Sequence, residues 1–96
     1  MSSNFLTIAH TLNKCLNLEL LLEIEYPDCL CGNYREFSED QRQLWYSYTF
    51  HELIGPVTLT CRMRLGRSLE LREVEFIKGR IERFIYSSVI AEYEKM

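Results

Sequence analysis

The sequence predicts an α+β fold, with a short N-terminal helix, a three- to four-stranded antiparallel sheet, and a long C-terminal helix packed on one sheet face. Apolar residues recur at helical spacing in residues 4–16 and again in residues 69–93. Between these two segments, apolar and polar residues alternate in several short runs, as they do along strands with one buried face. Hairpin-length connections between the runs favour antiparallel neighbours.

The first helix is expected over residues 4–16. Its apolar stripe consists of residues at positions i, i+3, i+4, i+7 and i+11: Phe5, Ile8, Ala9, Leu12 and Leu16. Ser3 or Asn4 can cap its start, because their side-chain oxygens accept hydrogen bonds from free backbone N–H groups. Asn17 is a suitable end, because asparagine tolerates the left-handed conformation that often terminates a helix.

A strand is expected over residues 18–26, where leucine and isoleucine alternate with glutamate. A helix that continues from residue 5 to residue 25 is the alternative, because leucine and glutamate are both good helix formers. The turn at residues 27–33 would lead into a short strand at residues 34–37. Residues 38–41 then indicate a polar connection or a single helical turn capped by Ser38.

Two further strands are expected over residues 44–51, which are rich in aromatic side chains, and residues 57–65, which alternate strictly. Gly55-Pro56 would separate them, and Gly66 would end the second. The outer faces of the first and last strands carry opposite charges: Glu19, Glu23 and Glu25 on one, Arg62 and Arg64 on the other. Opposite charges across a ladder attract, so these two strands are predicted to be neighbours.

The C-terminal helix is expected over residues 69–93, with Ser68 as its cap and a kink or close contact at Gly79. Its main apolar face is formed by Val74, Ile77, Ile81, Phe84, Ile85 and Ser88. A second apolar set projects from a flank: Phe76, Tyr86, Ile90 and Tyr93. Because a two-layer domain covers one side of such a helix, this set needs the N-terminal helix, a second copy or a partner to cover it.

Composition limits the classes of protein. A chain of 96 residues forms a single domain, residues 1–96, and its 47% hydrophobic content excludes a mainly disordered state. No uncharged run approaches the roughly twenty apolar residues that a membrane span needs. The N-terminus lacks the features of a signal peptide, so the four cysteines are expected to be reduced and the protein cytoplasmic.

Motifs for catalysis are missing from the sequence. It contains no nucleophile elbow, phosphate loop or metalloprotease helix, so an enzyme is not expected, nor are catalytic residues or a cofactor. Cys29 and Cys31 stand in a turn, but a zinc site needs a second ligand pair, and none is spaced for it. The expectation is therefore no metal site, with shared zinc or a redox role for this pair as the alternative.

By exclusion, and because aromatic residues are abundant, we expect a non-catalytic protein–protein interaction module. An adaptor, an inhibitor or an antitoxin-like accessory protein of a phage or bacterium would fit, as would a homodimer. The expected partner-binding residues are Tyr86, Ile90 and Tyr93, followed by Trp45 and Tyr48.

The alternative is a nucleic-acid-binding protein that uses the basic stretch from Arg62 to Arg83. The net charge is −3, so there is no basic footprint over the whole protein, although a local one is compatible with the sequence. The contact residues would be Arg62, Arg64, Arg67 and Arg80. Four glutamates are interleaved in this stretch, and pairing within the helix can account for several of the charges.

Overall fold

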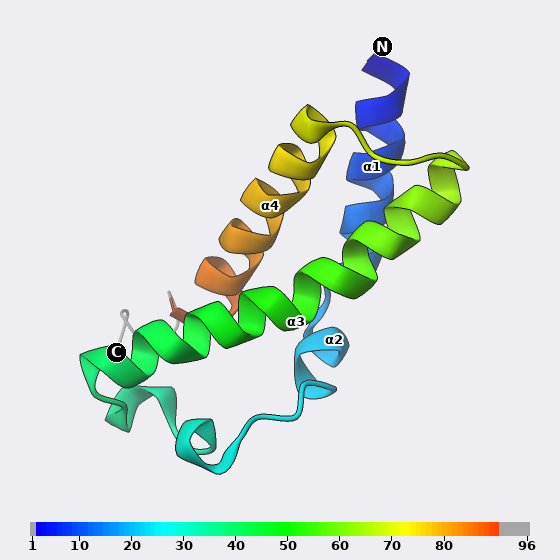
Figure 1. Cartoon of the computed structure of the whole chain (residues 1–96). Coiled ribbons are helices and arrows are strands. Elements are labelled where there is room, and N and C mark those ends of the chain that lie inside the picture. The colour runs from blue at the N-terminus through cyan, green and yellow to red at the C-terminus, as the bar shows by residue number, and fades with distance from the viewer. Residues whose placement is uncertain (1, 91–96) are drawn as a thin grey trace.

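The computed structural model describes residues 2–90, which form a bundle of helices and contain no strand (Figure 1). The prediction of an α+β fold with an antiparallel sheet is therefore wrong. The helices are α1 (Ser2–Cys15), α2 (Leu18–Leu22), α3 (Glu39–Leu65) and α4 (Leu71–Ile85). Two 3-10 turns, η1 (Asp28–Leu30) and η2 (Tyr34–Glu36), precede α3, and a π-helical turn, η3 (Tyr86–Ile90), continues α4.

The first and last helices run in the same direction, and both pack on α3 (Figure 1). The ring of Phe5 near the start of α1 meets the ring of Phe76 edge-on, with centroids 5.5 Å apart. Further along, the guanidinium group of Arg80 donates a hydrogen bond of 2.7 Å to the side-chain oxygen of Asn13. Part of the second apolar set of the C-terminal helix, Phe76, is thus covered by α1.

The core lies among these three helices. Along α3 every fourth residue is buried: Trp45, Thr49, Leu53, Val57 and Cys61. From α1 it receives Ile8 and Leu12, and from α4 Ile77, Ile81 and Ile85. A repeat of four residues is a helical period, and α4 shows the same one from Glu73 to Ile85.

The predicted first strand is replaced by a short helix and an extended segment. Asn17 begins α2, since its side-chain oxygen accepts a hydrogen bond of 3.0 Å from the backbone N–H of Leu20. Leu22 is 84% exposed, so the leucines do not form a single buried face. After α2 the chain runs to Tyr26, whose hydroxyl group is hydrogen-bonded at 2.7 Å to that of Thr49.

The two predicted strands around Gly55-Pro56 are parts of one helix of 27 residues. Ser38 and Gln41 form a capping box at its start, which confirms Ser38 as a cap but for a far longer helix than one turn. Pro56 lies on the exposed side of α3, so water can hydrate the carbonyl group of Glu52 that lacks an N–H partner. Gly66 ends the helix in the left-handed conformation, with φ of 71°.

The remaining local predictions have mixed outcomes. Residues 34–36 form a 3-10 turn in place of a strand, and with no ladder in residues 2–90 the proposed strand neighbours do not exist. The long C-terminal helix is present, although its N-cap is Glu70 and Ser68 lies outside it. Gly79 is exposed, and a Cβ atom at this position would meet no heavy atom within 4 Å other than the neighbouring helix backbone, so no close contact explains it.

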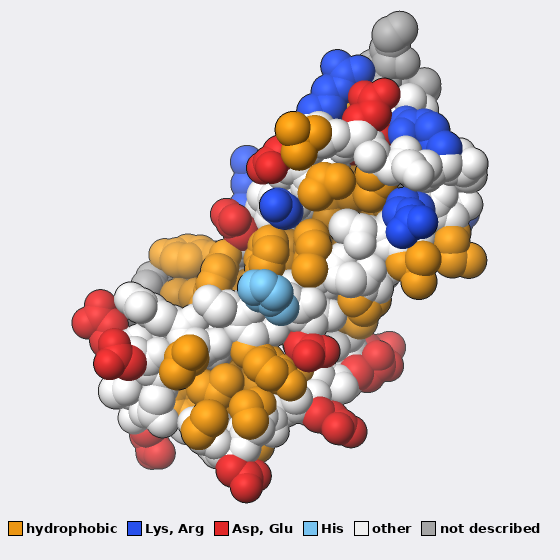
Figure 2. Space-filling model, viewed as in Figure 1, with side chains coloured by type: hydrophobic (Ala, Val, Ile, Leu, Met, Phe, Trp, Pro, Cys, Tyr) orange, Lys and Arg blue, Asp and Glu red, His pale blue; other side chains and the backbone are white. Residues whose placement is uncertain are grey.

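Charge is separated along the molecule, whose principal extents are 44 × 26 × 22 Å. Residues 18–52 contain eight acidic and two basic side chains, a net charge of −6, whereas residues 62–83 contain seven basic and four acidic ones, a net charge of +3. Figure 2 shows acidic side chains gathered over the end with α2 and the start of α3, and basic ones over the opposite end. Among the helices described, none has the length and apolarity needed to cross a bilayer.

Candidate functional site

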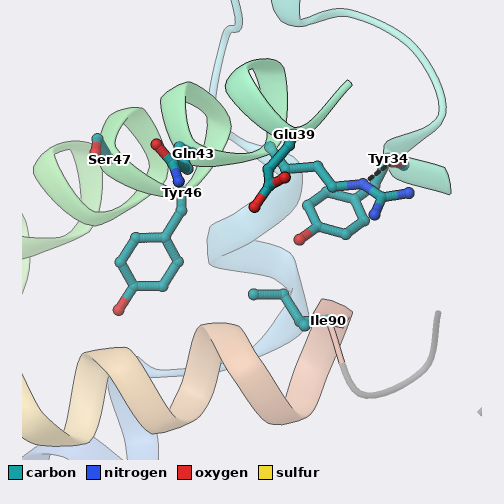
Figure 3. Close-up of a pocket in the computed structure, with 7 residues that line it drawn as sticks. Tyr34, Glu39, Gln43, Tyr46, Ser47 and Ile90 are labelled. Carbon is teal, nitrogen blue, oxygen red and sulfur yellow. Dashed lines mark hydrogen bonds between the residues drawn. The ribbon is translucent and has the colours of Figure 1, made fainter. Parts of the chain in front are cut away.

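Between the first half of α3 and the end of α4 lie two adjoining hollows of about 700 and 610 Å³ that share Tyr46. We call them together the tyrosine groove. The larger hollow is lined by Tyr34, Glu39, Arg42, Gln43, Tyr46, Ser47 and Ile90. The smaller is lined by Tyr46, Glu82, Arg83, Tyr86 and Ser87. Figure 3 shows the larger hollow, with Ile90 facing the side chains of α3 across the opening.

Tyr46 forms the middle of the tyrosine groove. Its ring stacks on that of Phe50 with centroids 6.5 Å apart and an angle of 20° between the planes, which fixes its orientation. Partial burial, and to a smaller extent the carboxylate of Glu82, raise the pKa of the Tyr46 hydroxyl group above its usual value. The hydroxyl group therefore remains protonated near neutral pH and can donate a hydrogen bond.

The far end of the groove is built from η2 and the start of α3. Arg42 donates hydrogen bonds to the carbonyl oxygens of Tyr34, at 3.3 Å, and of Arg35, at 2.9 Å. The guanidinium carbon of Arg42 also lies 5.1 Å from the centroid of the Tyr34 ring. That ring also meets Trp45 edge-on at 5.2 Å. Tyr34 is thus held in place, and the charge of Arg42 is engaged by backbone groups.

Two of the predicted partner-binding residues line this groove. Tyr86, which is 51% exposed, borders the smaller hollow, and Ile90 borders the larger one. Both belong to the π-helical turn η3, an uncommon conformation that is enriched at functional sites. Tyr93 lies outside the described residues.

The second choices lie elsewhere. Trp45 is 8% exposed and belongs to the core, where its ring stacks on that of Tyr26 at 6.1 Å. The hydroxyl group of Tyr48 donates a hydrogen bond of 2.8 Å to the carbonyl oxygen of Glu25, and this fastens the segment after α2 to α3. Neither residue borders the tyrosine groove.

Two of the four arginines of the nucleic-acid alternative are bonded to other side chains of the protein. Arg67 is bonded to Glu73, and this hydrogen-bonded pairing raises the pKa of its guanidinium group. Arg80 donates a hydrogen bond to the side-chain oxygen of Asn13 on α1. Arg62 and Arg64 are exposed near the end of α3.

Sequence reasoning missed the α3 wall of the groove. Glu39, Gln43 and Tyr46 are spaced four and three residues apart, a signal for one helical face that is visible only when residues 39–65 are assigned as a helix. A strand would put Tyr46 on the same face as Tyr48, whereas in the helix the two side chains point in different directions.

Cysteine and histidine side chains do not converge on a metal site in residues 2–90: no group of three or more metal-ligating side chains occurs there. Cys29 and Cys31 are exposed in the turn before α3, and the Cys31 thiol donates to the carbonyl oxygen of Tyr26 at 3.3 Å. Nδ1 of His51 lies 2.8 Å from the carbonyl oxygen of Ser47, one helical turn earlier.

No family model, curated protein or solved structure matches this chain.

Proposed function

We propose that this chain is a small, non-catalytic protein-interaction module, and that the tyrosine groove binds an amphipathic helix with basic flanks from a partner protein. The observation that carries the proposal is the open groove, in which Tyr46 joins two hollows and Tyr86 and Ile90 form the opposite wall. A groove between two helices is a common binding site for the apolar face of a third helix.

The lining suits such a helix. Tyrosine offers a large apolar ring at low entropic cost and a hydroxyl group for hydrogen bonding at the rim, which is why it is frequent at binding hot spots. Tyr34 and Tyr46 are already oriented by ring contacts, so binding would not have to order them. Each hollow is large enough to accept one or two apolar side chains of the partner.

The surrounding charge selects the partner's flanks. Glu39 on α3 and Glu82 on α4 border the groove, and the segment from residue 18 to residue 52 has a net charge of −6. Two basic residues also line the groove. Arg42 donates hydrogen bonds to backbone carbonyl groups, and Arg83 of α4 lines the smaller hollow. Lysine or arginine beside the apolar stripe would complement this field, and glutamate there would be repelled.

The test is a selection from a displayed library of amphipathic helices with randomised flanks, carried out on the full chain. Enriched helices are expected to share apolar residues at i, i+3 or i+4, and i+7 and to carry lysine or arginine beside them. Tyr46→Ala and Tyr86→Glu should each weaken their binding at least about tenfold. The matched control is Leu59→Glu, which changes another exposed apolar residue that does not line the groove.

Charge reversal gives the sharpest result. In Glu39→Lys and Glu82→Lys, helices with basic flanks should lose affinity and helices with acidic flanks should gain it. Failure to enrich any helix, enrichment without charge preference, or a stronger effect of Leu59→Glu than of Tyr86→Glu would overturn the proposal.

Self-association is a separate outcome. A homodimer through this groove would appear in sedimentation equilibrium of the chain alone and would dissociate in Tyr86→Glu, in which case a second copy takes the place of the partner helix. The nucleic-acid alternative has less support, because two of its four arginines, Arg67 and Arg80, are bonded to other side chains of the protein.

A further inference from the structure

A small hollow of about 160 Å³ lies between α1 and the last turn of α3, away from the tyrosine groove. Four residues of α1 line it, at positions i, i+3, i+4 and i+7 of one helical face: Thr7, His10, Thr11 and Lys14. Arg64 of α3 closes it from the other side. The hollow therefore joins two cations, an imidazole group and two hydroxyl groups from two helices that pack together.

No described residue forms an ion pair with the two cations that line this hollow. Within residues 2–90, Lys14, Arg64 and His10 make no ion pair or side-chain hydrogen bond. There is no acidic residue in α1, and α3 has none between Glu52 and its C-terminal end. The two helices that form the hollow thus carry positive side chains there with no carboxylate of either helix nearby.

We propose that this hollow binds a phosphate group, as the free ion or as a phosphomonoester. The guanidinium group of Arg64 can donate two hydrogen bonds to neighbouring oxygens, and Lys14 and His10 can each donate one more. The Thr11 hydroxyl group already donates to the carbonyl oxygen of Thr7 at 2.9 Å, so its proton is not available to the anion. A volume of 160 Å³ corresponds to roughly five water molecules, which is enough for the five heavy atoms of a phosphate.

A competing explanation assigns Lys14 and Arg64 only to helix stability. Each lies in the last turn of its helix, where a cation interacts favourably with the negative end of the macrodipole. That role requires neither a common hollow nor His10. It predicts that removing either charge lowers the stability of the fold, and that the parent chain binds no anion here. The two explanations can thus be separated by measuring binding and stability in the same variants.

The experiment is a titration of the isotopically labelled full chain with inorganic phosphate at constant ionic strength, followed by amide chemical shifts. Saturable shifts in residues 7–14 and around residue 64 are expected. Arg64→Gln and Lys14→Gln should each weaken binding at least about tenfold, and Lys14→Arg should retain it. The matched control is Arg62→Gln, which removes the same charge from the same helix at a position that does not line the hollow.

Further ligands identify the source of the phosphate group. Phosphoserine, a monoester, should bind as inorganic phosphate does, whereas dimethyl phosphate, a diester with a single charge, should bind at least about tenfold more weakly. Equal binding of the diester would point to a nucleic-acid backbone and overturn the proposal as stated. So would shifts that do not saturate, equal losses in Arg62→Gln and Arg64→Gln, or loss of stability in Lys14→Gln and Arg64→Gln without any phosphate binding by the parent chain.

Discussion

Arg67 and Glu73 form a two-pronged ion pair across the turn that joins α3 to α4. Nη1 of Arg67 lies 2.9 Å from Oε1 of Glu73, and Nη2 lies 2.8 Å from Oε2. Oε1 also accepts a hydrogen bond of 2.8 Å from the backbone N–H of Glu70. Glu73 is 1% exposed, so its carboxylate fixes the entry to α4 from inside the protein.

Replacing Glu73 by glutamine should destabilise the fold by about 2–3 kcal/mol, because it leaves the Arg67 guanidinium group without its anion and weakens the cap of α4. The measurement is the free energy of unfolding from urea denaturation. Glu75→Gln is the control: this carboxylate is exposed and lies 4.0 Å from Lys78, so its loss should cost less than about 0.5 kcal/mol. Equal effects of the two substitutions would contradict a structural role for the Arg67–Glu73 pair.

Acid should weaken the same pair. The hydrogen bonds from Arg67, with a smaller contribution from the Glu70 N–H, lower the pKa of Glu73 from 4.5 to about 2. A carboxyl group whose pKa is lower in the folded chain stabilises the fold above its unfolded pKa, and this stabilisation is lost as the pH falls from about 4.5 towards 2. The free energy of unfolding should therefore fall more steeply between pH 5 and pH 2.5 (about the window of this titration) in the parent chain than in Glu73→Gln. If the free energies of unfolding of the two proteins changed in parallel with pH, the titration of Glu73 would not contribute to stability.

Glycine substitutions test whether α3 is continuous. Gly55 lies inside the helix, and a Cβ atom at this position would have no heavy atom within 4 Å other than the neighbouring helix backbone, so Gly55→Ala should stabilise the protein by about 0.5–1 kcal/mol. Gly66 has φ of 71°, so Gly66→Ala should destabilise it by about 1 kcal/mol. Thermal unfolding of both variants is the measurement. Destabilisation by Gly55→Ala would instead favour a turn between two strands.

The four cysteines should differ in reactivity towards an alkylating agent. Burial, with a smaller contribution from the nearby Cys15, raises the pKa of the Cys61 thiol to about 11, and its side chain is completely buried. Cys29 and Cys31 are exposed and should be modified first, whereas Cys61 should react only as fast as the protein opens. Peptide mapping by mass spectrometry after timed quenching gives the order. Modification of Cys61 at the rate of Cys29 would show that the α1–α3 contact opens easily.

The sequence predicts a helix correctly where its buried face is a long and regular stripe of apolar residues. The stripes around Ile8 and Leu12 and around Ile77 and Ile81 are of this kind, and both helices are present in the structure. The prediction failed for α3, because tyrosine, threonine and valine are frequent in strands and Gly55-Pro56 is typical of a turn. Packing against two helices outweighs these local preferences, and the four-residue repeat from Trp45 to Cys61 was the signal that remained.

The candidate site was accessible to sequence reasoning only in part. The second apolar stripe of the C-terminal helix predicts an interface at Tyr86 and Ile90, and both residues lie beside the groove. The opposite wall at Glu39, Gln43 and Tyr46 depends on α3 being a helix, and the hollow at Lys14 and Arg64 depends on how α1 crosses it. Such contacts between distant segments are not encoded in any local pattern.

The order of the helices has a consequence for synthesis of the chain. Ile8 and Leu12 are completely buried in the finished bundle, in a core whose other walls are α3 and α4. On the ribosome, α1 emerges long before the second half of α3 and α4 have been translated, so its apolar stripe has no permanent cover in the nascent chain. Until α4 has left the exit tunnel, only transient contacts can cover the apolar stripe of α1, and its final packing forms after that point.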